Sequence, residues 1–427
     1  MSKLDELISE LCPDGVRYKK VGDICYKITD YTAAGSFADI AKNVKYINDG
    51  KGFAQLVRTT DLKTSFVHKD KFVYVDENAF NYLWRVNLDS EALVLPNVGN
   101  CGEVYYVTPD IFTNSKNVLG PNAILVKSDT ANMRFLYHIF LHNEFQNNLL
   151  KITSSTGQTK FNKTNFKELR IPFPPLPVQN EIVRILDNFT ELTAELTAEL
   201  TARKKQYEYY KNELFNKAVD IQIVTLDIIA DNCDSQRRPV TSGNRKTGDI
   251  PYYGASGIVD YVKDYIFEGD YLLISEDGAN LLARTTPIAF SVSGKAWVNN
   301  HAHVLKFDEY ATRRYVEMYL NSIDLSPYIT GAAQPKLNQK NLNNIKIPLP
   351  ALPEQQRIVD ILDRFDTLCN DISIGLPAEI KARQQQYEYY RDKLLTFPKV
   401  ETEVSYGEEA EANHAEAENS KCIKAQF

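Results

Sequence analysis

The sequence lacks the motifs on which most nucleotide-dependent and metal-dependent enzymes rely. It contains no GxxxxGK[ST] phosphate loop, no HExxH and no N/D-P-P-Y/F segment, which argues against nucleotide hydrolysis, zinc proteolysis and amino-group methylation. Its six cysteines form no CxxC pair and do not cluster with histidine. We therefore expect neither a zinc site nor a disulfide framework, but ordinary reduced thiols. The cysteines stand at positions 12, 25, 101, 233, 369 and 422.

Long hydrophobic runs are missing as well. No apolar run approaches the length of a membrane span, and the N-terminal MSKLDELISEL has no apolar centre of the kind found in signal peptides. We expect a soluble, cytoplasmic protein with no membrane partner.

Positive charge is in deficit, because the net charge is −7, and this at first argues against a nucleic-acid partner. Residues 401–427 alone hold seven Glu and two Lys, a net of −5, so the rest of the chain carries only −2. Basic residues can therefore still gather on one face of each domain. The acidic tail is expected to be disordered, and contact with another subunit is the alternative.

What the chain does contain is a long repeated segment. PLPVQNEIVRILDNF, from Pro175, recurs as ALPEQQRIVDILDRF from Ala351, and both copies continue to the sequence QYEYY. Apolar residues follow one another in alternating steps of three and four, which is the spacing of a coiled-coil seam. The tandem TAEL repeats at 193–200 are a stutter in the first copy, whereas Gly375 and Pro377 should interrupt the second.

The predicted seam and partner-binding positions occur in both copies. Those of the first copy are Ile182, Ile185, Phe189, Leu192, Leu196, Leu200, Tyr207 and Tyr210. Those of the second copy are Ile358, Ile361, Phe365, Leu368, Ile372, Leu376, Ile380, Tyr387 and Tyr390. The tyrosines are expected to pack the coiled coil and its partner helices, with stacking on bases as the alternative.

A chain of 427 residues needs more than one core, and the repeat indicates two domains. Segments 92–100 and 271–279 match at an offset of 179, as do 122–129 and 301–308, so the domains share a plan. The first carries about 26 extra residues before this shared part. In that domain we predict one helix over Met133–Leu150 and strands at Gln55–Thr59, Lys71–Val75, Ala92–Leu95, Val104–Thr108 and Ala123–Val126.

The order of domain, long helix, related domain and matching long helix, with I-P-x-P-x-L-P-x-Q at each junction, resembles the specificity subunit of type I restriction-modification systems. The resemblance implies two target recognition domains that each read one half of a split sequence in double-stranded DNA. It also implies that the two helices pack antiparallel, as a spacer and as the docking surface for two DNA adenine methyltransferase subunits. Restriction and translocase subunits would complete the complex.

The resemblance further implies a protein that acts in defence against foreign DNA and has no chemistry of its own. S-adenosylmethionine, ATP and magnesium would be used by the partner subunits, and no cofactor is expected in this chain. The predicted fold class is α/β (α+β), with two related mixed domains separated by two long helices. The predicted limits are 1–174 for recognition domain 1 with a short helix at 2–11, 175–217 for the central helix, 218–350 for recognition domain 2, 351–398 for the distal helix and 399–427 for the tail.

Each domain ends in a polar, glycine-bearing loop, SSTGQTKFN at 154–162 and TGAAQPKLN at 330–338. Glutamine can pair with adenine through two hydrogen bonds, and lysine can bind guanine or phosphate. We therefore predict DNA contacts here, while a solvated loop that leads into the helix is the alternative. The residues concerned are Gly157, Gln158, Lys160, Gln334 and Lys336.

Further candidates follow strands or lie in basic loops. Clustered cations suit phosphate contact, although a simple charged surface loop is the alternative; these are Arg237, Arg238, Arg245 and Lys246. Residues placed to read base edges are Asn97, Asn100, Asn280 and Arg284, although Asn also makes ordinary turns. His301 and His303 share one strand face; with no third ligand in sight, a hydrogen-bonded or DNA-facing pair is favoured over a metal pair, and His301 is the predicted DNA contact.

A non-catalytic coiled-coil adaptor whose globular domains bind protein remains as the alternative function. DNA binding should weaken steeply as salt rises, whereas a dry protein interface should respond little. The sequence leaves open which bases are read, the spacer length, which loop residues touch bases rather than phosphates, whether restriction subunits are present, and the role of the tail.

Overall fold

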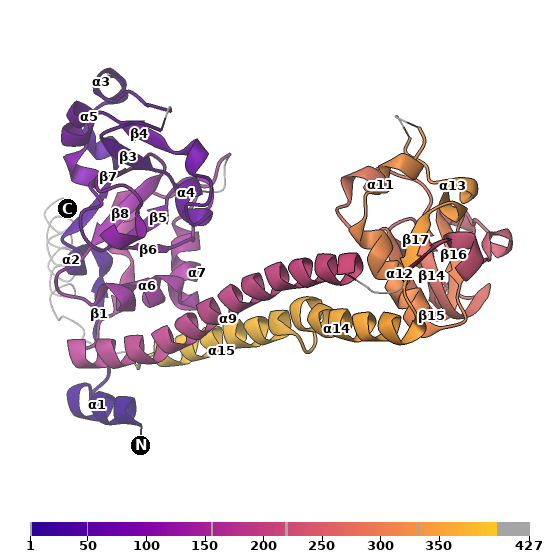
Figure 1. Cartoon of the computed structure of the whole chain (residues 1–427). Coiled ribbons are helices and arrows are strands. Elements are labelled where there is room, and N and C mark those ends of the chain that lie inside the picture. Colours follow the sequence, from indigo (N-terminus) through magenta and orange to yellow (C-terminus); the bar gives the residue numbers. More distant parts are fainter. Residues whose placement is uncertain (1, 49, 155–156, 218–220, 332–333, 399–427) are drawn as a thin grey trace, which may run out of the picture. The chain divides into compact units, whose positions relative to one another are not determined.

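The computed structural model describes residues 2–48, 50–154, 157–217, 221–331 and 334–398. The predicted acidic tail lies outside these residues. The described chain divides into two compact units, one with residues up to Thr193 and from Arg383 onwards, the other with Ala194–Ala382. The divisions fall inside the long helices, so each unit combines one globular domain with parts of both helices (Figure 1). Among the described residues, no helix is long and apolar enough to cross a membrane.

Unit 1 contains a four-stranded sheet of order β2-β8-β5-β6, a three-stranded sheet of order β4-β3-β7 and the pair β1-β9. The five predicted strands are confirmed as β3, β4, β5, β6 and β8. The strands are β1 Tyr18–Lys20, β2 Lys27–Asp30, β3 Ala54–Val57, β4 Val73–Val75, β5 Ala92–Pro96, β6 Tyr105–Val107, β7 Asn117–Leu119, β8 Ala123–Lys127 and β9 Arg170–Pro172. The helices of the globular domain are α1 Lys3–Leu11, α2 Val21–Ile24, α3 Phe37–Asn43, α4 Thr59–Lys63, α5 Glu77–Tyr82, α6 Met133–Leu141, α7 Asn143–Lys151 and α8 Lys163–Glu168.

Unit 2 has a six-stranded sheet of order β11-β16-β14-β15-β12-β13 and the pair β10-β17. Its strands are β10 Gln222–Thr225, β11 Asp231–Asn232, β12 Thr247–Gly254, β13 Gly257–Val262, β14 Phe267–Ser275, β15 Ala289–Val298, β16 Ala302–Lys306 and β17 Lys346–Leu349. Its shorter helices are α10 Leu226–Ile229, α11 Asn280–Ala283, α12 Tyr310–Ser322 and α13 Gln339–Asn343.

The predicted shared plan is confirmed by the strand register. In unit 1, β5 pairs antiparallel with β8, with Leu93 opposite Val126 and Leu95 opposite Ile124. In unit 2, β14 pairs with β16 in the same way, with Leu272 opposite Leu305 and Ile274 opposite His303. Each number differs by 179 from its counterpart (93 and 272, 126 and 305, 95 and 274, 124 and 303). The predicted offset therefore holds residue by residue.

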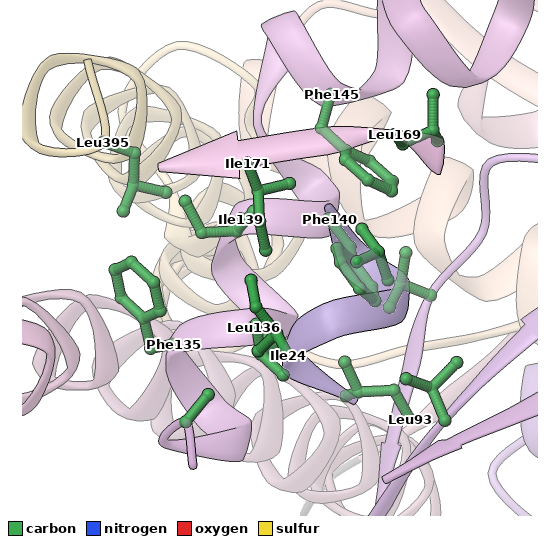
Figure 2. Packing of buried hydrophobic residues seen from close by; sticks show 14 of the residues in the cluster. Ile24, Leu93, Phe135, Leu136, Ile139, Phe140, Phe145, Leu169, Ile171 and Leu395 are labelled. Carbon is green, nitrogen blue, oxygen red and sulfur yellow. The ribbon is translucent and has the colours of Figure 1, made fainter. Parts of the chain in front are cut away.

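The single helix predicted over Met133–Leu150 is wrong in one respect, because the structure has two helices there. The chain leaves helical geometry at His142, which has φ −67° and ψ 143° and separates α6 from α7. The bend folds α7 back so that Phe140 and Phe145 stack at 4.5 Å between ring centroids. The predicted apolar face is buried in the domain core: Phe135, Leu136, Ile139, Phe140, Phe145 and Leu149. Figure 2 labels the first five of these residues.

The first repeated segment forms one long helix, α9 Leu176–Lys217, and the second forms α14 Leu352–Asn370 and α15 Leu376–Leu394. The predicted interruption near Gly375 is confirmed. A Cβ atom at Gly375 would lie 2.4 Å from the carbonyl oxygen of Thr367, so only glycine allows this approach. Placing Ile372 in the seam was wrong: it is 82% exposed, because α14 has already ended.

Aromatic contacts show that the helices run antiparallel within each unit. In unit 1, Phe189 stacks on Tyr390 at 5.2 Å, and in unit 2, Phe365 stacks on Tyr210 at 5.8 Å. These two pairs are counterparts in the repeat. Earlier residues of α9 share a core with the residues that follow α15, and later residues of α9 share one with the start of α14. The predicted antiparallel coiled coil is thereby confirmed.

The remaining seam positions differ in burial. Ile182, Ile358 and Tyr387 are buried, whereas Tyr210, Leu368 and Tyr390 are 40%, 36% and 39% exposed. The others are half-buried: Ile185, Phe189, Leu192, Leu196, Leu200, Tyr207, Ile361 and Phe365. Sequence reasoning missed a second apolar face that packs into the globular domains, formed by Val178 and Leu186 on α9 and by Val359 and Leu362 on α14.

The helix predicted at the N-terminus is confirmed as α1, capped by Ser2 with Asp5 completing a capping box. Leu4 is 3% exposed and belongs to the core that holds the start of α9. We expect Leu4→Ala to lower the free energy of unfolding by about 2 to 4 kcal/mol, because removal of the buried methyl groups leaves a cavity. Leu11→Ala is the control, because Leu11 is 38% exposed. Equal effects in chemical denaturation would contradict this role of α1.

Candidate nucleic-acid interface

In unit 1, backbone hydrogen bonds join the turn after β5 to the polar loop that precedes α8. The Gly99 N–H donates to the Thr159 carbonyl at 2.8 Å, and the Phe161 N–H donates to the Asn97 carbonyl at 3.1 Å. Gly99 and Gly157 have φ values of +85° and +81°, which glycine adopts without strain. The structure thus brings together two sequence segments that were predicted separately as DNA contacts.

Unit 2 repeats this arrangement. The Gly278 N–H donates to the Pro335 carbonyl at 3.2 Å, and the Leu337 N–H donates to the Glu276 carbonyl at 2.8 Å. Gly331 has a φ of +85°, and a Cβ atom on it would lie 2.4 Å from the Gln334 carbonyl. The same two bonds therefore hold the same two loops in both domains.

The candidate side chains in these loops are largely open to solvent. Asn100, Gly157, Gln158 and Lys160 are exposed in unit 1, as are Gln334 and Lys336 in unit 2, while Asn97 is half-buried. Beside Asn97 lies a surface hollow of about 700 Å³ that is also lined by Tyr31, Phe37 and Tyr46. The 84% exposure of Phe37 places an aromatic ring next to the candidate contacts.

The basic cluster of unit 2 divides into two pairs. Arg237 is 14% exposed and binds Asp234 at 3.2 Å and Glu276 at 2.6 Å. Arg245 pairs with Asp260 at 3.0 Å and lies over the Tyr252 ring at 4.3 Å. These two arginines therefore already have structural partners.

The second pair of cations, Arg238 and Lys246, is exposed. Both positions leave the charged group available to a phosphate, so they suit the predicted contact best.

Asn280 and Arg284 shape the loop that carries them. The Asn280 side chain donates to the Thr286 carbonyl at 3.0 Å and accepts from the Thr286 N–H at 3.1 Å. Arg284 donates to the Ile323 carbonyl at 2.5 Å, and burial lowers its pKa. Asn280 thus closes its own loop, and Arg284 holds the end of α11 against the end of α12. Direct base reading by either residue remains a prediction.

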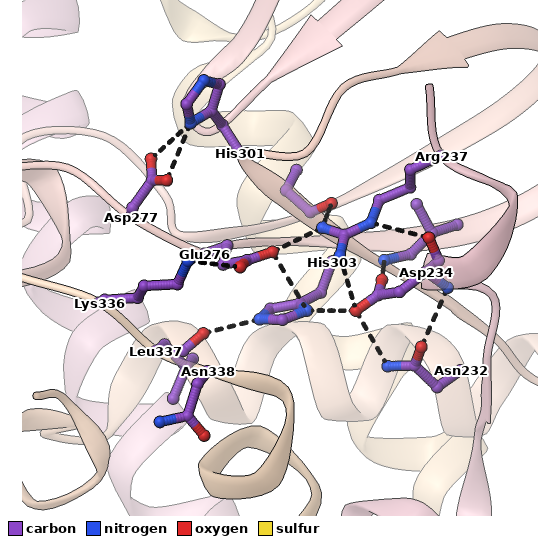
Figure 3. Close-up of polar contacts among 12 residues, drawn as sticks. Asn232, Asp234, Arg237, Glu276, Asp277, His301, His303, Lys336, Leu337 and Asn338 are labelled. Atoms are coloured by element: carbon purple, nitrogen blue, oxygen red, sulfur yellow. Dashed lines mark hydrogen bonds and ion pairs between the residues drawn. The ribbon is translucent and has the colours of Figure 1, made fainter. Parts of the chain in front are cut away.

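His301, which directly precedes β16, and His303, which lies on β16, have different surroundings (Figure 3). His301 is half-exposed and pairs with Asp277 at 2.8 Å. His303 is 1% exposed, and its Nδ1 lies 2.6 Å from Asp234 Oδ2. Sequence reasoning missed Asp234 and Glu276 as its partners, since they lie far apart in the chain. Asp234, Glu276 and His303 have metal-ligand side chains within 4.8 Å of one another, but the Arg237 guanidinium binds both carboxylates, as expected of an ion-pair network.

Each domain is fixed to the helix that follows it by equivalent glutamines. Gln179 donates to the Pro174 carbonyl and accepts from the Asn132 N–H at 2.9 Å. Gln355 donates to the Pro350 carbonyl and accepts from the Thr312 hydroxyl at 2.8 Å. Both are buried, so the Q of the junction motif anchors the helix start.

Further along each of these helices, charged contacts attach the helix to its domain as well. Arg134 on α6 binds Asp187 on α9 at 2.6 Å, and Arg314 on α12 binds Asp363 on α14 at 2.8 Å. Both domains thus bind their helix at corresponding carboxylates.

A family model described as the type I restriction modification DNA specificity domain matches residues 13–203 and 218–382. A putative type I restriction enzyme specificity subunit of Haemophilus influenzae is 38% identical over 193 residues, which cover 44% of this chain and 50% of the relative. The EcoR124I/EcoR124II specificity subunit of Escherichia coli is 38% identical over 270 residues, covering 56% of this chain and 66% of that protein. The matches thus span less than two thirds of either relative.

The crystal structure of a type I restriction-modification S subunit from M. genitalium has a TM-score of 0.54 with this chain at 14% identity. The match covers 89% of this chain and 96% of that chain, which supports the fold. The family model matches once for each globular domain and covers well over half of the residues. The chain therefore belongs to the type I restriction-modification specificity family, as the resemblance of its sequence predicted.

Proposed function

We propose that the chain reads a bipartite target in double-stranded DNA, with one half-site for each globular domain. The observation that carries this proposal is the duplicated loop pair, in which exposed Gln158 and Gln334 occupy corresponding loops held by the same backbone bonds. Two related modules joined by a long helix suit a split site, because each can occupy one groove of the duplex. Arg238 and Lys246 would add phosphate contacts.

The long helices would dock two DNA adenine methyltransferase subunits. Tyr209 on α9 and Tyr389 on α15 support this, because both are 61% exposed and occupy matching positions of the repeat. Aromatic residues are enriched at protein interfaces. S-adenosylmethionine would be used by the methyltransferase subunits, and ATP and magnesium by restriction and translocase subunits in a full complex.

The proposal predicts that the two glutamines act on different half-sites. After co-expression with the cognate methyltransferase, modified adenines are mapped across a genome for wild type, Gln158→Ala and Gln334→Ala. Each variant should relax or weaken one half-site by roughly 10-fold to 100-fold per lost base contact and leave the other intact. Lys306→Ala on β16 is the control, since this exposed residue lies outside both the loops and the long helices.

If each variant affected both half-sites, the assignment of one glutamine to each half-site would be wrong.

The adaptor alternative is tested separately by measuring DNA affinity between about 50 and 200 mM salt, where a protein making several phosphate contacts loses affinity by orders of magnitude. Salt-independent or undetectable binding would overturn the proposed function as a whole.

A further inference from the structure

The two loop pairs share their backbone bonds but rest on different side chains. In unit 2, Lys336 and Leu337 of the loop contact Glu276 and His303. The strand register places Asn97 and Ile124 at the equivalent positions of unit 1. In unit 1, Lys163, the first residue of α8 after the loop, forms an ion pair with Asp30 at 2.8 Å. A histidine therefore lies under the second loop and not under the first.

Both ring nitrogens of His303 face groups that accept hydrogen bonds. Nδ1 lies 2.6 Å from Asp234 Oδ2, and Nε2 lies 2.7 Å from the Leu337 carbonyl oxygen. A carbonyl oxygen cannot donate, so Nε2 must carry a hydrogen for that bond. Asp234 also binds Arg237 and accepts from the Val304 N–H at 2.8 Å, which favours the ionised carboxylate. Both bonds then form only with the doubly protonated imidazolium.

A second histidine shows the contrast. Nε2 of His138 faces Asp187, but Nδ1 faces the Tyr387 hydroxyl at 2.9 Å. A hydroxyl can donate as well as accept, so neutral His138 satisfies both bonds. Burial lowers the pKa of His138, in agreement with the neutral form. The protonation required at His303 is thus a feature of its own partners.

The surrounding charges balance an imidazolium. Glu276 lies 3.8 Å from His303 and also binds Arg237 and, at 3.1 Å, Lys336. Burial would raise the pKa values of Asp234 and Glu276, but His303, Arg237 and, for Glu276, Lys336 outweigh burial and lower them. Figure 3 shows this network joining the turn after β11, the end of β14, β16 and the 330–338 loop.

We propose that protonated His303 is a positioning residue that holds residues 334–338 in place for reading the second half-site. Its Nε2–H holds Leu337, the residue next to the candidate contact Lys336, while Asp234 holds the imidazolium in place. This inference rests on the proposed function. Lost protonation leaves one of the two bonds unmade, so the hold on the loop weakens as pH rises. In unit 1, Ile124 occupies the position of His303, so the first half-site provides the internal comparison.

The test uses the chain in complex with its methyltransferase and DNA duplexes that carry the mapped target or one altered half-site. Discrimination, the ratio of affinities for intact and altered duplexes, is measured from about pH 6 to about pH 9. For wild type, discrimination at the second half-site should fall about tenfold or more with rising pH, and discrimination at the first should stay level.

Three variants separate positioning from simple stability. His303→Gln should lower second half-site discrimination at all pH values and abolish its pH dependence. Asp234→Asn keeps the acceptor for Val304 and can donate to a neutral ring, so it should flatten the pH profile while retaining more discrimination than His303→Gln. His68→Gln is the control, because this exposed histidine of unit 1 lies outside both loop pairs, and it should preserve the profile.

The outcomes distinguish this inference from the proposed function. Loss of sequence-specific binding by the wild-type complex would overturn the proposed function. If recognition is normal but discrimination does not depend on pH at either half-site, or depends on pH equally at both, only the proposed role of His303 is overturned. Thermal unfolding is measured for each variant at each pH, and a folded His303→Gln variant with wild-type discrimination would also overturn it.

Discussion

Removing Thr197–Leu200 from α9 is expected to shorten the gap between the two half-sites and to leave both half-sites unchanged. These residues form the second TAEL repeat inside a helix that runs without interruption from Leu176 to Lys217. Four residues contribute about 6 Å of helix length, which corresponds to one or two base-pair steps of about 3.4 Å. Methylation of the target with the original spacing should fall by roughly 100-fold or more, because only one of its two half-sites can then be bound.

The helix geometry explains why a whole tetrapeptide is needed. Four residues turn the helix by about 400°, only about 40° beyond a full turn, so the apolar seam stays close to register. Mapping of methylated adenines measures the gap directly. The length-preserving variant Thr197→Ala is the control and should keep the original spacing. Methylation at an unchanged gap after the deletion would show that helix length does not act as the spacer.

The sequence was most informative where the chain repeats itself. The offset of 179 between the domains correctly predicted which strands correspond, because equivalent residues occupy the same register positions. The seam period also predicted the long helices, since a coiled coil imposes its spacing on the sequence. Gly375 marked the break between α14 and α15 because no larger residue fits against the Thr367 carbonyl.

The candidate site was less predictable because tertiary contacts decide which side chains are free. Arg237 and Arg238 are neighbours in the sequence, yet Arg237 is enclosed by two carboxylates and Arg238 is exposed. Those carboxylates, Asp234 and Glu276, come from separate segments, so composition alone gave no signal for them. Local pattern also missed the bend at His142, where extended backbone interrupts an otherwise helical apolar period.

Asp187→Asn is expected to lower the stability of unit 1 substantially. Asp187 accepts from Arg134 Nη2 at 2.6 Å and from Nε at 3.1 Å, and it also receives His138 Nε2 at 2.9 Å. His138 in turn bonds the hydroxyl of Tyr387 at 2.9 Å, so one carboxylate links α6, α9 and α15. Its loss should cost about 2 to 3 kcal/mol, or roughly 5 to 10 °C in the unfolding temperature of a unit of this size.

Asp363→Asn in unit 2 provides the matched control. Arg314 also binds Glu317 at 2.5 Å and Asp366 at 3.3 Å, so it keeps two carboxylates when Asp363 is neutralised. Its variant should therefore destabilise the protein less than Asp187→Asn. Calorimetric unfolding of both variants measures the difference, and equal losses would contradict the special role of Asp187.

The pH dependence of the Asp187→Asn effect follows from two lowered pKa values in unit 1. Burial keeps the pKa of His138 below its ordinary value. Below about pH 6.5 the unfolded chain therefore binds a proton that the folded chain does not yet take up. As a result, the free energy of unfolding falls on acidification. Burial alone would raise the pKa of Asp187, but His138 and Arg134 outweigh it and lower the pKa. The stabilising effect of the Asp187 carboxylate is therefore complete above the ordinary aspartate pKa of about 4, and it is lost as the pH falls through the lowered pKa of the folded state. The difference in unfolding temperature between wild type and Asp187→Asn should accordingly persist at every pH at which the Asp187 carboxylate is ionised, and it should narrow below about pH 4. A difference that persists in stronger acid would place the origin of the effect in packing rather than in charge.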